Sequence, residues 1–232
     1  MTEIIKRFDN LLPNPLNRIL QCYLETDPKS LFVDRTSHIQ EDHALYIYNK
    51  KFSGIFDKIN DQGHLSSAVV DLGPESLSNI FEYQMVTTWA NPSINNQFTS
   101  PMWFALDRLG MELIDIYRIK TNISFRNTAD DQIAFPHFDH PGHTNVPDAT
   151  WYSLVYYIHD SDGDTILFDK HAEDILDHRT KSPLEIVEES SPKSNSAILF
   201  NSNRIHSYRY PVVNQYRSVI NCVFLAKPKG EK

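Results

Sequence analysis

"TWYSLVYYIHDSDGDTILFDK", residues 150–170, consists of two apolar, β-branched and aromatic runs separated by a turn rich in Asp and Gly. This composition predicts two strands joined by a turn. Short runs of the same kind, each bounded by Asp, Gly, Asn, Ser or Pro, occupy residues 115–125, 184–190, 196–202 and 217–226. Several short strands separated by turn signals indicate an antiparallel sandwich or a small barrel. We therefore expect a mainly β fold with flanking helices.

The N-terminal part of the chain has a residue pattern typical of helices. Apolar residues recur at helical spacing in three segments, residues 14–26, 73–90 and 100–114. Pro74 is expected in the helix start of the second segment, whereas Ser100 is expected as the N-cap of the third, with Pro101 in its first turn. We expect residues 1–232 to form a single domain. In it a mixed, largely helical support region (1–114) precedes a β core (115–226).

Composition limits the function classes and the setting. The formal net charge is −8, and no run of Lys or Arg is present, which disfavours nucleic acid as a partner without excluding it. Cys22 and Cys222 lie far apart and predict ordinary buried thiols in a reducing compartment rather than a disulfide framework. No apolar run approaches the about 18 residues of a membrane helix, and residues 1–10 do not resemble a signal peptide. The expectation is a soluble, cytoplasmic protein, whose oligomeric state the sequence does not indicate.

"PHFDHPGH", residues 136–143, holds three histidines and an aspartate. On a strand, side chains two positions apart point to the same side, so His137 and Asp139 are expected to face one cavity together. His140 would face the opposite side, and the Pro and Gly that follow would end the strand. His137 and Asp139 are therefore the pair predicted to bind a metal.

The third ligand is expected to be His206, in the loop that follows the apolar run at 197–200. Two imidazoles and one carboxylate form the facial triad of non-haem Fe(II) oxygenases, and the lack of cysteine ligands argues against structural zinc. A histidine cluster that binds no metal is the alternative. The sequence leaves open whether four further residues contact a substrate or are ordinary surface residues: His140, His143, Arg204 and Arg209. Arg118 is open to the same two interpretations.

Arg217 is the first residue of the last predicted strand, and it suggests that the protein binds a dicarboxylate. Arg217, Val219 and Asn221 share one face of that strand. A guanidinium that projects into an otherwise apolar barrel needs an anion, because an unpaired buried charge is costly. A planar dicarboxylate can provide one in a bidentate pairing.

These features together resemble the iron- and 2-oxoglutarate-dependent oxygenases. The resemblance runs from about residue 115 to 225 and rests on "HFD" (137–139), "LVYYIHDSDGDTILF" (154–168) and "RIHSYRYPVVNQYRSVINCVF" (204–224). It is strongest for the prolyl-hydroxylase-like branch, including its compact members from marine phages and bacteria. The resemblance implies a double-stranded β-helix, a jelly-roll or cupin-like barrel with metal and co-substrate in its mouth.

Position by position, the resemblance also implies ligand roles. The family's iron ligands match His137, Asp139 and His206. Arg217 matches the basic residue that pairs with the distal carboxylate of 2-oxoglutarate, and Tyr157 matches a tyrosine that often donates a hydrogen bond to the same group. Asn122 lies where several members place an amide near the co-substrate.

Two positions depart from the family pattern. Some branches have Ser two residues after the Arg, whereas this chain has Val219, so Tyr157 is expected to contribute more of the anchoring. The hairpin reads "DGDT" in place of a double-glycine form, and neither Asp164 nor Thr165 is therefore assigned a role.

The activity implied by the resemblance is that of an Fe(II)- and 2-oxoglutarate-dependent dioxygenase that uses O2. Such an enzyme hydroxylates a C–H bond of a peptidyl residue, an amino acid or another small molecule, and releases succinate and CO2. No acid–base residue separate from the metal centre is implied. Two alternatives stay open: a cupin-like metal protein with a different reaction, and a non-catalytic β-barrel interaction module.

Overall fold

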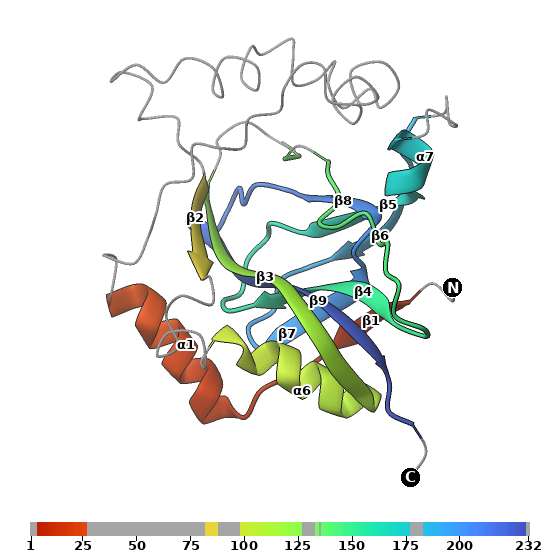
Figure 1. Ribbon diagram of the computed structural model, residues 1–232. Helices are drawn as coiled ribbons and strands as arrows, with labels where there is room; N and C mark the ends of the chain where they lie inside the picture. The colour runs from red at the N-terminus through yellow and green to blue at the C-terminus, as the bar shows by residue number, and fades with distance from the viewer. Residues whose placement is uncertain are drawn as a thin grey trace.

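Two antiparallel sheets form the body of the protein (Figure 1). The computed structural model describes residues 4–26, 82–87, 98–126, 133–134, 136–176 and 183–230. The larger sheet has the strand order β1 (Ile5–Phe8), β7 (Ser196–Asn201), β4 (Thr150–Tyr157), β9 (Tyr216–Pro228), β3 (Met111–Phe125) and β2 (Glu82–Thr87). The smaller sheet has the order β6 (Ile186–Ser190), β5 (Thr165–His171) and β8 (Arg204–Tyr208).

The turn at 158–164 crosses from one sheet to the other. β4 pairs with β7 and β9 in the larger sheet, whereas β5 pairs with β6 and β8 in the smaller one. Both predicted strands and the turn between them are present, but they do not form the hairpin that the family resemblance implies. Successive strands that alternate between two facing sheets are the arrangement of a jelly roll.

The strand alternation of β4 separates two apolar layers. Leu154 and Tyr156 belong to a core cluster that includes Leu20 of α1 (Asn14–Thr26) and Met102 of α6 (Ser100–Leu109). Val155 and Tyr157 point the other way, into a cluster completed by residues of both sheets: Leu167, Ile198, Phe200 and Val219. Helices thus cover the outer face of the larger sheet, and its inner face meets the smaller sheet (Figure 1).

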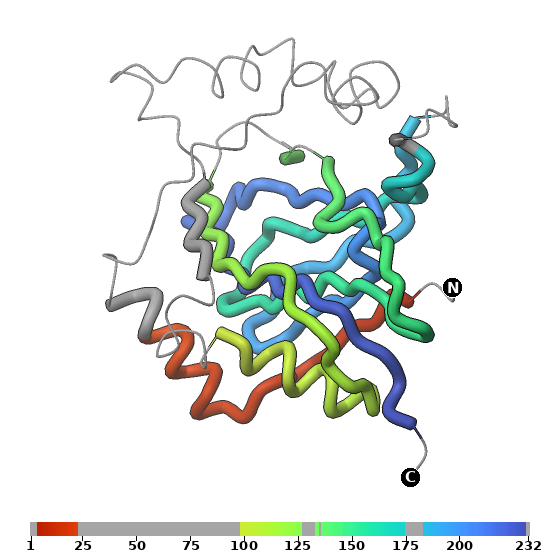
Figure 2. Tube along the Cα trace, viewed as in Figure 1, coloured from red at the N-terminus to blue at the C-terminus, as the bar shows by residue number. Residues whose placement is uncertain are grey.

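β3 and β9 are the long strands on which the site is built. They pair over their whole length, from Met111 opposite Pro228 to Phe125 opposite Tyr216 (Figure 2). Residues directly opposite each other in an antiparallel pair point to the same side. The inner face of these strands therefore carries a polar row on β3, made of Arg118, Lys120, Asn122 and Ser124.

Two N-terminal predictions need correction. The helix expected over 73–90 is wrong where the structure describes that segment, because residues 82–87 form β2 and pair with the edge of β3. Its other residues, and Pro74 with them, lie outside the described parts of the chain. Pairing along an open sheet edge outweighs a helical spacing of apolar residues, since propensity is a weak preference.

The helix expected over 100–114 is shorter than predicted. α6 ends at Leu109, because Gly110 adopts a left-handed conformation (φ 62°) and its N–H bonds the carbonyl of Asp107. Met111 already begins β3. Thr99 takes the cap position predicted for Ser100, and Pro101 lies in the first turn as expected.

Most of the other predictions agree with the structure or remain untested by it. The helix over residues 14–26 is present as α1. Cys22 and Cys222 are free thiols, and Cys222 is buried as predicted, but the burial predicted for Cys22 is wrong because this residue is exposed. A short helix, α7 (Ala172–Leu176), follows β5. Among the described helices, none has the length and apolarity needed to cross a membrane. The division at residue 114 stays a prediction, and β1 adds an N-terminal strand that the sequence did not indicate.

Candidate metal and co-substrate site

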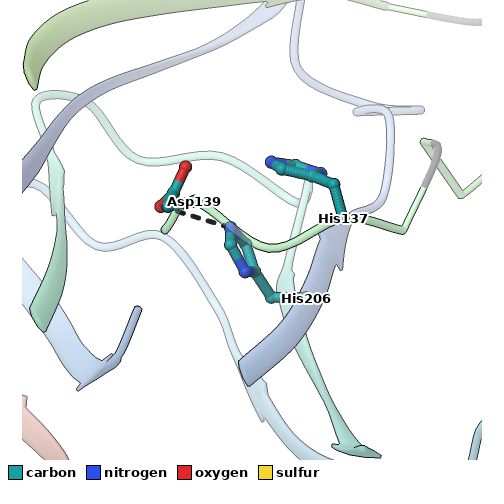
Figure 3. A group of neighbouring side chains, drawn as sticks. All are labelled: His137, Asp139 and His206. Atoms are coloured by element: carbon teal, nitrogen blue, oxygen red, sulfur yellow. Dashed lines mark ion pairs between the residues drawn. The ribbon is translucent and has the colours of Figure 1, made fainter. Parts of the chain in front are cut away.

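Three predicted ligands converge between the sheets (Figure 3). One ligand atom each from His137, Asp139 and His206 lies within 4.8 Å of the other two. The backbone brings the histidines together, because His137 and His206 exchange N–H···O bonds of 2.9 and 2.8 Å across an isolated bridge. Their ring centroids are 4.4 Å apart. Two nitrogen donors and one carboxylate form a set that fits Fe(II).

His137 and Asp139 converge as expected, but the strand expected to carry them is absent, because His137 forms an isolated bridge and Asp139 lies in a bend. The loop predicted around the third ligand is also wrong. His206 is the third residue of β8 and pairs with Leu167 of β5. Asp139 lies in a bend, and its backbone N–H donates a hydrogen bond to the carbonyl of Ser202. A regular strand on one side and a bridged segment on the other therefore hold the ligands.

His206 is fixed in one tautomer by its backbone contact. Its Nδ1 lies 3.0 Å from the carbonyl oxygen of Arg204, which can only accept a hydrogen bond, so Nδ1 carries the proton. Burial lowers the pKa of His206 and outweighs the effect of Asp139, which raises it. The ring is therefore neutral near pH 7, and Nε2, 3.5 Å from Asp139 Oδ2, presents a lone pair suitable for a metal.

Asp139 is a buried carboxylate with three donors around it. Ser153 Oγ donates to Oδ2 at 2.7 Å, Asn221 Nδ2 lies 3.1 Å from the same oxygen, and Arg118 forms an ion pair with Oδ1. Burial by itself would raise the pKa of Asp139, but the charge that His206 carries when protonated in the acid range, the charge of Arg118 and the Ser153 hydrogen bond more than offset it. The pKa therefore lies far below the usual range, and the group is ionised.

Arg118 and Asn221 both contact Asp139, a role that the sequence did not predict for either residue. Asn221 was placed correctly on the face of Arg217, but no role followed from that placement. Arg118 comes from β3, and its contact with Asp139 depends on how three separate chain segments pack. No local spacing signal could have identified it.

Arg217 occupies a second polar position between the sheets. Its side chain is almost completely buried, with Nε donating to the carbonyl of Gly163 and Nη2 to Thr165 Oγ1, both at 2.8 Å. The guanidinium carbon lies 4.8 Å from the ring centroid of Tyr208. The sequence argument placed Arg217 inside the barrel, and the side chain lies there.

Tyr157 and Arg217 meet through a residue to which the sequence assigned no role. Thr165 Oγ1 receives a hydrogen bond of 2.8 Å from each of them, and Tyr157 OH also lies 3.2 Å from the carbonyl of Ser190. Burial raises the pKa of Tyr157, so the phenol is protonated and can donate. Val219 packs among apolar residues beside Tyr157 and offers no hydroxyl.

Asn122 lies opposite Val219 on the inner face of β3. Its Oδ1 is buried and has no hydrogen-bond partner within the described part of the chain, and the same holds for Ser124 Oγ and Asn221 Oδ1. Buried polar atoms without partners are rare in native proteins. These atoms lie on β3 and β9, the strands that also carry Arg118 and Arg217.

The neighbouring histidines do not join the triad. His140 Nδ1 accepts the N–H of Gly142 at 3.1 Å, and its ring lies 4.2 Å from that of Trp151. His143 is exposed, and its carbonyl accepts the indole N–H of Trp151. Arg204 is buried and donates to the carbonyl of Phe168, which makes it a structural residue.

Gly163 gives a stability prediction for the Arg217 position. An added Cβ would lie 2.7 Å from the carbonyl oxygen of Arg209 and 2.9 Å from Arg217 Cδ, so the backbone or the arginine must move. Gly163→Ala should lower the free energy of unfolding by about 1–3 kcal/mol, the usual range for overpacking. Urea denaturation measures it, with Gly230→Ala as the control because nothing lies within 4 Å of its added Cβ. Equal stability of the two variants would contradict the close packing around Arg217.

Comparison with solved structures identifies the fold. A non-haem α-ketoglutarate-dependent carbocyclase, SnoK from nogalamycin biosynthesis, superposes with a TM-score of 0.56 at 9% identity, over 99% of this chain and 84% of that one. The α-ketoglutarate-dependent epimerase SnoN from the same biosynthesis gives 0.53 at 9% identity, over 97% and 79%. A prolyl-4-hydroxylase from Pseudomonas putida gives 0.45 at 13% identity, over 99% and 95%.

No family model matches the chain, and no curated protein matches it. The likeness to the first two structures extends over nearly the whole chain and establishes the fold. The mainly β fold class predicted from the sequence is confirmed: the chain has the double-stranded β-helix of 2-oxoglutarate–Fe(II) oxygenases. It combines this fold with an intact His-x-Asp…His triad.

Proposed function

We propose that this protein is an Fe(II)- and 2-oxoglutarate-dependent dioxygenase that hydroxylates a C–H bond of a peptidyl residue, an amino acid or another small molecule. The observation that carries the proposal is the convergence of His137, Asp139 and His206 inside a barrel of this fold. Acidic net charge disfavours nucleic acid as the substrate. A cytoplasmic location, which the free cysteines favour, is part of the same proposal.

In this proposal the triad side chains hold the metal. His137 and His206 would supply one imidazole nitrogen each, and Asp139 would supply one carboxylate oxygen. The chemistry supplied by the bound iron is oxidative decarboxylation of 2-oxoglutarate with O2, coupled to hydroxylation of the substrate and release of succinate and CO2. The protein binds, orients and shields the reactants.

The residues around Arg217 hold the co-substrate. Arg217 pairs with the distal carboxylate of 2-oxoglutarate, and Thr165 and Tyr157 fix the guanidinium and add hydroxyl donors. Asn122 offers its amide to the same molecule, which is supported by its partnerless oxygen. The inner face of the barrel is lined by apolar side chains around Val219, so water is excluded from the ion pair and the pairing is strengthened.

The arginine is also what distinguishes this proposal from its alternatives. A cupin-like metal protein with a different reaction needs no cation buried at the position of Arg217. A non-catalytic interaction module needs no converging ligands, and the triad is complete. Both features favour the oxygenase.

Anaerobic addition of Fe(II) and 2-oxoglutarate to the purified protein tests the proposal. We expect a weak visible charge-transfer band that requires both additions, because only a chelate of the co-substrate on the iron produces it. On admission of O2, slow uncoupled release of succinate should follow even without a substrate. A protein that binds the metal but gives no band with 2-oxoglutarate would support the cupin-like alternative.

A further inference from the structure

A β-bulge on β3 lies beside the metal site and directly precedes Arg118, which contacts the ligand Asp139. Ile116 pairs with Phe224 and Arg118 with Val223, so Tyr117 is an extra residue in the β3–β9 register. Bulges re-aim side chains and are frequent beside active sites. Here Arg118 contacts Asp139, while the ring of Tyr117 lies 5.1 Å from that of the next residue, His140.

The contact with Asp139 does not satisfy all the hydrogen-bond donors of Arg118. Its Nη2 pairs with Oδ1, whereas its Nε is buried and has no hydrogen-bond partner within the described residues. In that part of the chain, Asp139 is the only acidic side chain in contact with the guanidinium. The side chain is 29% exposed, so a molecule entering the site can reach it.

The charges around the metal site favour an anion. Once a ferrous ion and 2-oxoglutarate are bound, the positive charges of the ion, Arg118 and Arg217 exceed the negative charges of Asp139 and the two co-substrate carboxylates by one. Lys120 lies on the same face of β3.

We propose that the substrate of this oxygenase carries a carboxylate, which Arg118 holds beside the metal site while the adjoining part of the substrate rests on the ring of Tyr117. The proposal builds on the function proposed above and names the substrate class. Arginine suits this role because its planar fork can keep one N–H on Asp139 and offer others to a second carboxylate. Tyr117 directly precedes Arg118 on β3, is 56% exposed, and offers an aromatic surface whose ring lies 5.1 Å from that of His140.

The test uses small probes and a readout that needs no turnover. Protein loaded with Mn(II) and 2-oxoglutarate without O2 is mixed with benzoate or with its neutral analogue benzamide, and paramagnetic relaxation of the probe protons reports binding near the metal. In the wild type, the paramagnetic relaxation of the benzoate protons should be at least about tenfold stronger than that of the benzamide protons, because benzoate forms a charge-assisted hydrogen bond. Arg118→Gln should remove this preference, and Arg118→Lys should retain part of it, because a charge without the fork remains.

Matched controls separate the site from general charge effects. Arg7→Gln removes the same charge from β1, where the side chain is 55% exposed and pairs with Glu188, and should leave the benzoate preference unchanged. Tyr117→Ala should weaken the binding of benzoate several-fold. The same change should hardly affect the binding of acetate, because only benzoate has a ring that can pack on the tyrosine.

Distinct results would overturn the inference. Equal relaxation by benzoate and benzamide in a wild-type protein that forms the Fe(II)–2-oxoglutarate band would refute the carboxylate while leaving the oxygenase proposal intact. A benzoate preference that survives in both Arg118 variants would also refute it, since the probe then binds elsewhere. Loss of 2-oxoglutarate binding in both variants would assign Arg118 to the co-substrate instead. Stronger relaxation of phenyl phosphate than of benzoate would replace the carboxylate by a phosphate, and absence of the band would refute the oxygenase itself.

Discussion

Replacing His206 by alanine should abolish the Fe(II)–2-oxoglutarate band and the release of succinate. The imidazole is buried, and its Nδ1 is fixed by the carbonyl of Arg204, so the change removes a preorganised donor and leaves a cavity. Loss of residues that only orient a ligand costs about 10–100-fold in metal affinity, and loss of a ligand itself should exceed that range. Anaerobic titration with Fe(II), followed by the visible band, measures the effect.

The neighbouring histidines provide the control. His143→Ala should keep the band, because the His143 side chain is exposed and only its backbone carbonyl is used, by Trp151. His137→Ala should behave like His206→Ala, since both rings lie at the triad. Loss of the band in His140→Ala together with its survival in His137→Ala would show that the wrong histidine of the 136–143 segment was selected.

Much of the site could be predicted because it depends on a two-residue period. His137 and Asp139 are two positions apart and converge with His206, and Arg217 and Asn221 lie on one face of β9 as the alternation requires. β9 imposes its part of this geometry locally, so the sequence suffices to predict it. His137 and Asp139 lie instead in an isolated bridge and a bend, where backbone bonds to His206 and Ser202 hold them. The same alternation in β4 divides its residues between the helix-covered core and the inter-sheet core.

The missed features depend on packing between distant segments. β2 forms because an edge of β3 is available for pairing. The availability of that edge cannot be predicted from the residue pattern of 82–87. The contact of Arg118 with Asp139 requires a bulge, and a bulge is a property of the β3–β9 register rather than of either strand alone. Thr165 follows a turn that crosses between sheets and not a hairpin, so its neighbour Arg217 could not be inferred from the turn sequence.

Replacing Arg217 by methionine should raise the KM for 2-oxoglutarate about 100-fold while Fe(II) still binds. Truncating one partner of a buried, hydrogen-bonded charge pair costs about 2–5 kcal/mol, and a factor of 100 corresponds to about 2.7 kcal/mol. Methionine fills a similar volume, so the packing against the Tyr208 ring is largely retained. Arg217→Lys should raise KM about tenfold, because the charge remains but the bidentate fork and the bond to Gly163 are lost. Succinate release at varied 2-oxoglutarate concentrations gives both values.

The matched control is Arg209→Met, which removes the same charge from a side chain that pairs with Glu189 at 2.6 Å near the molecular surface. Its KM for 2-oxoglutarate should equal that of the wild type. Mn(II) binding, followed by electron paramagnetic resonance, should be unchanged in Arg217→Met, because the triad does not include the arginine. An unaltered KM in Arg217→Met would mean that the co-substrate's distal carboxylate is held elsewhere. Arg217 would then serve only to join Gly163 and Thr165 across the barrel.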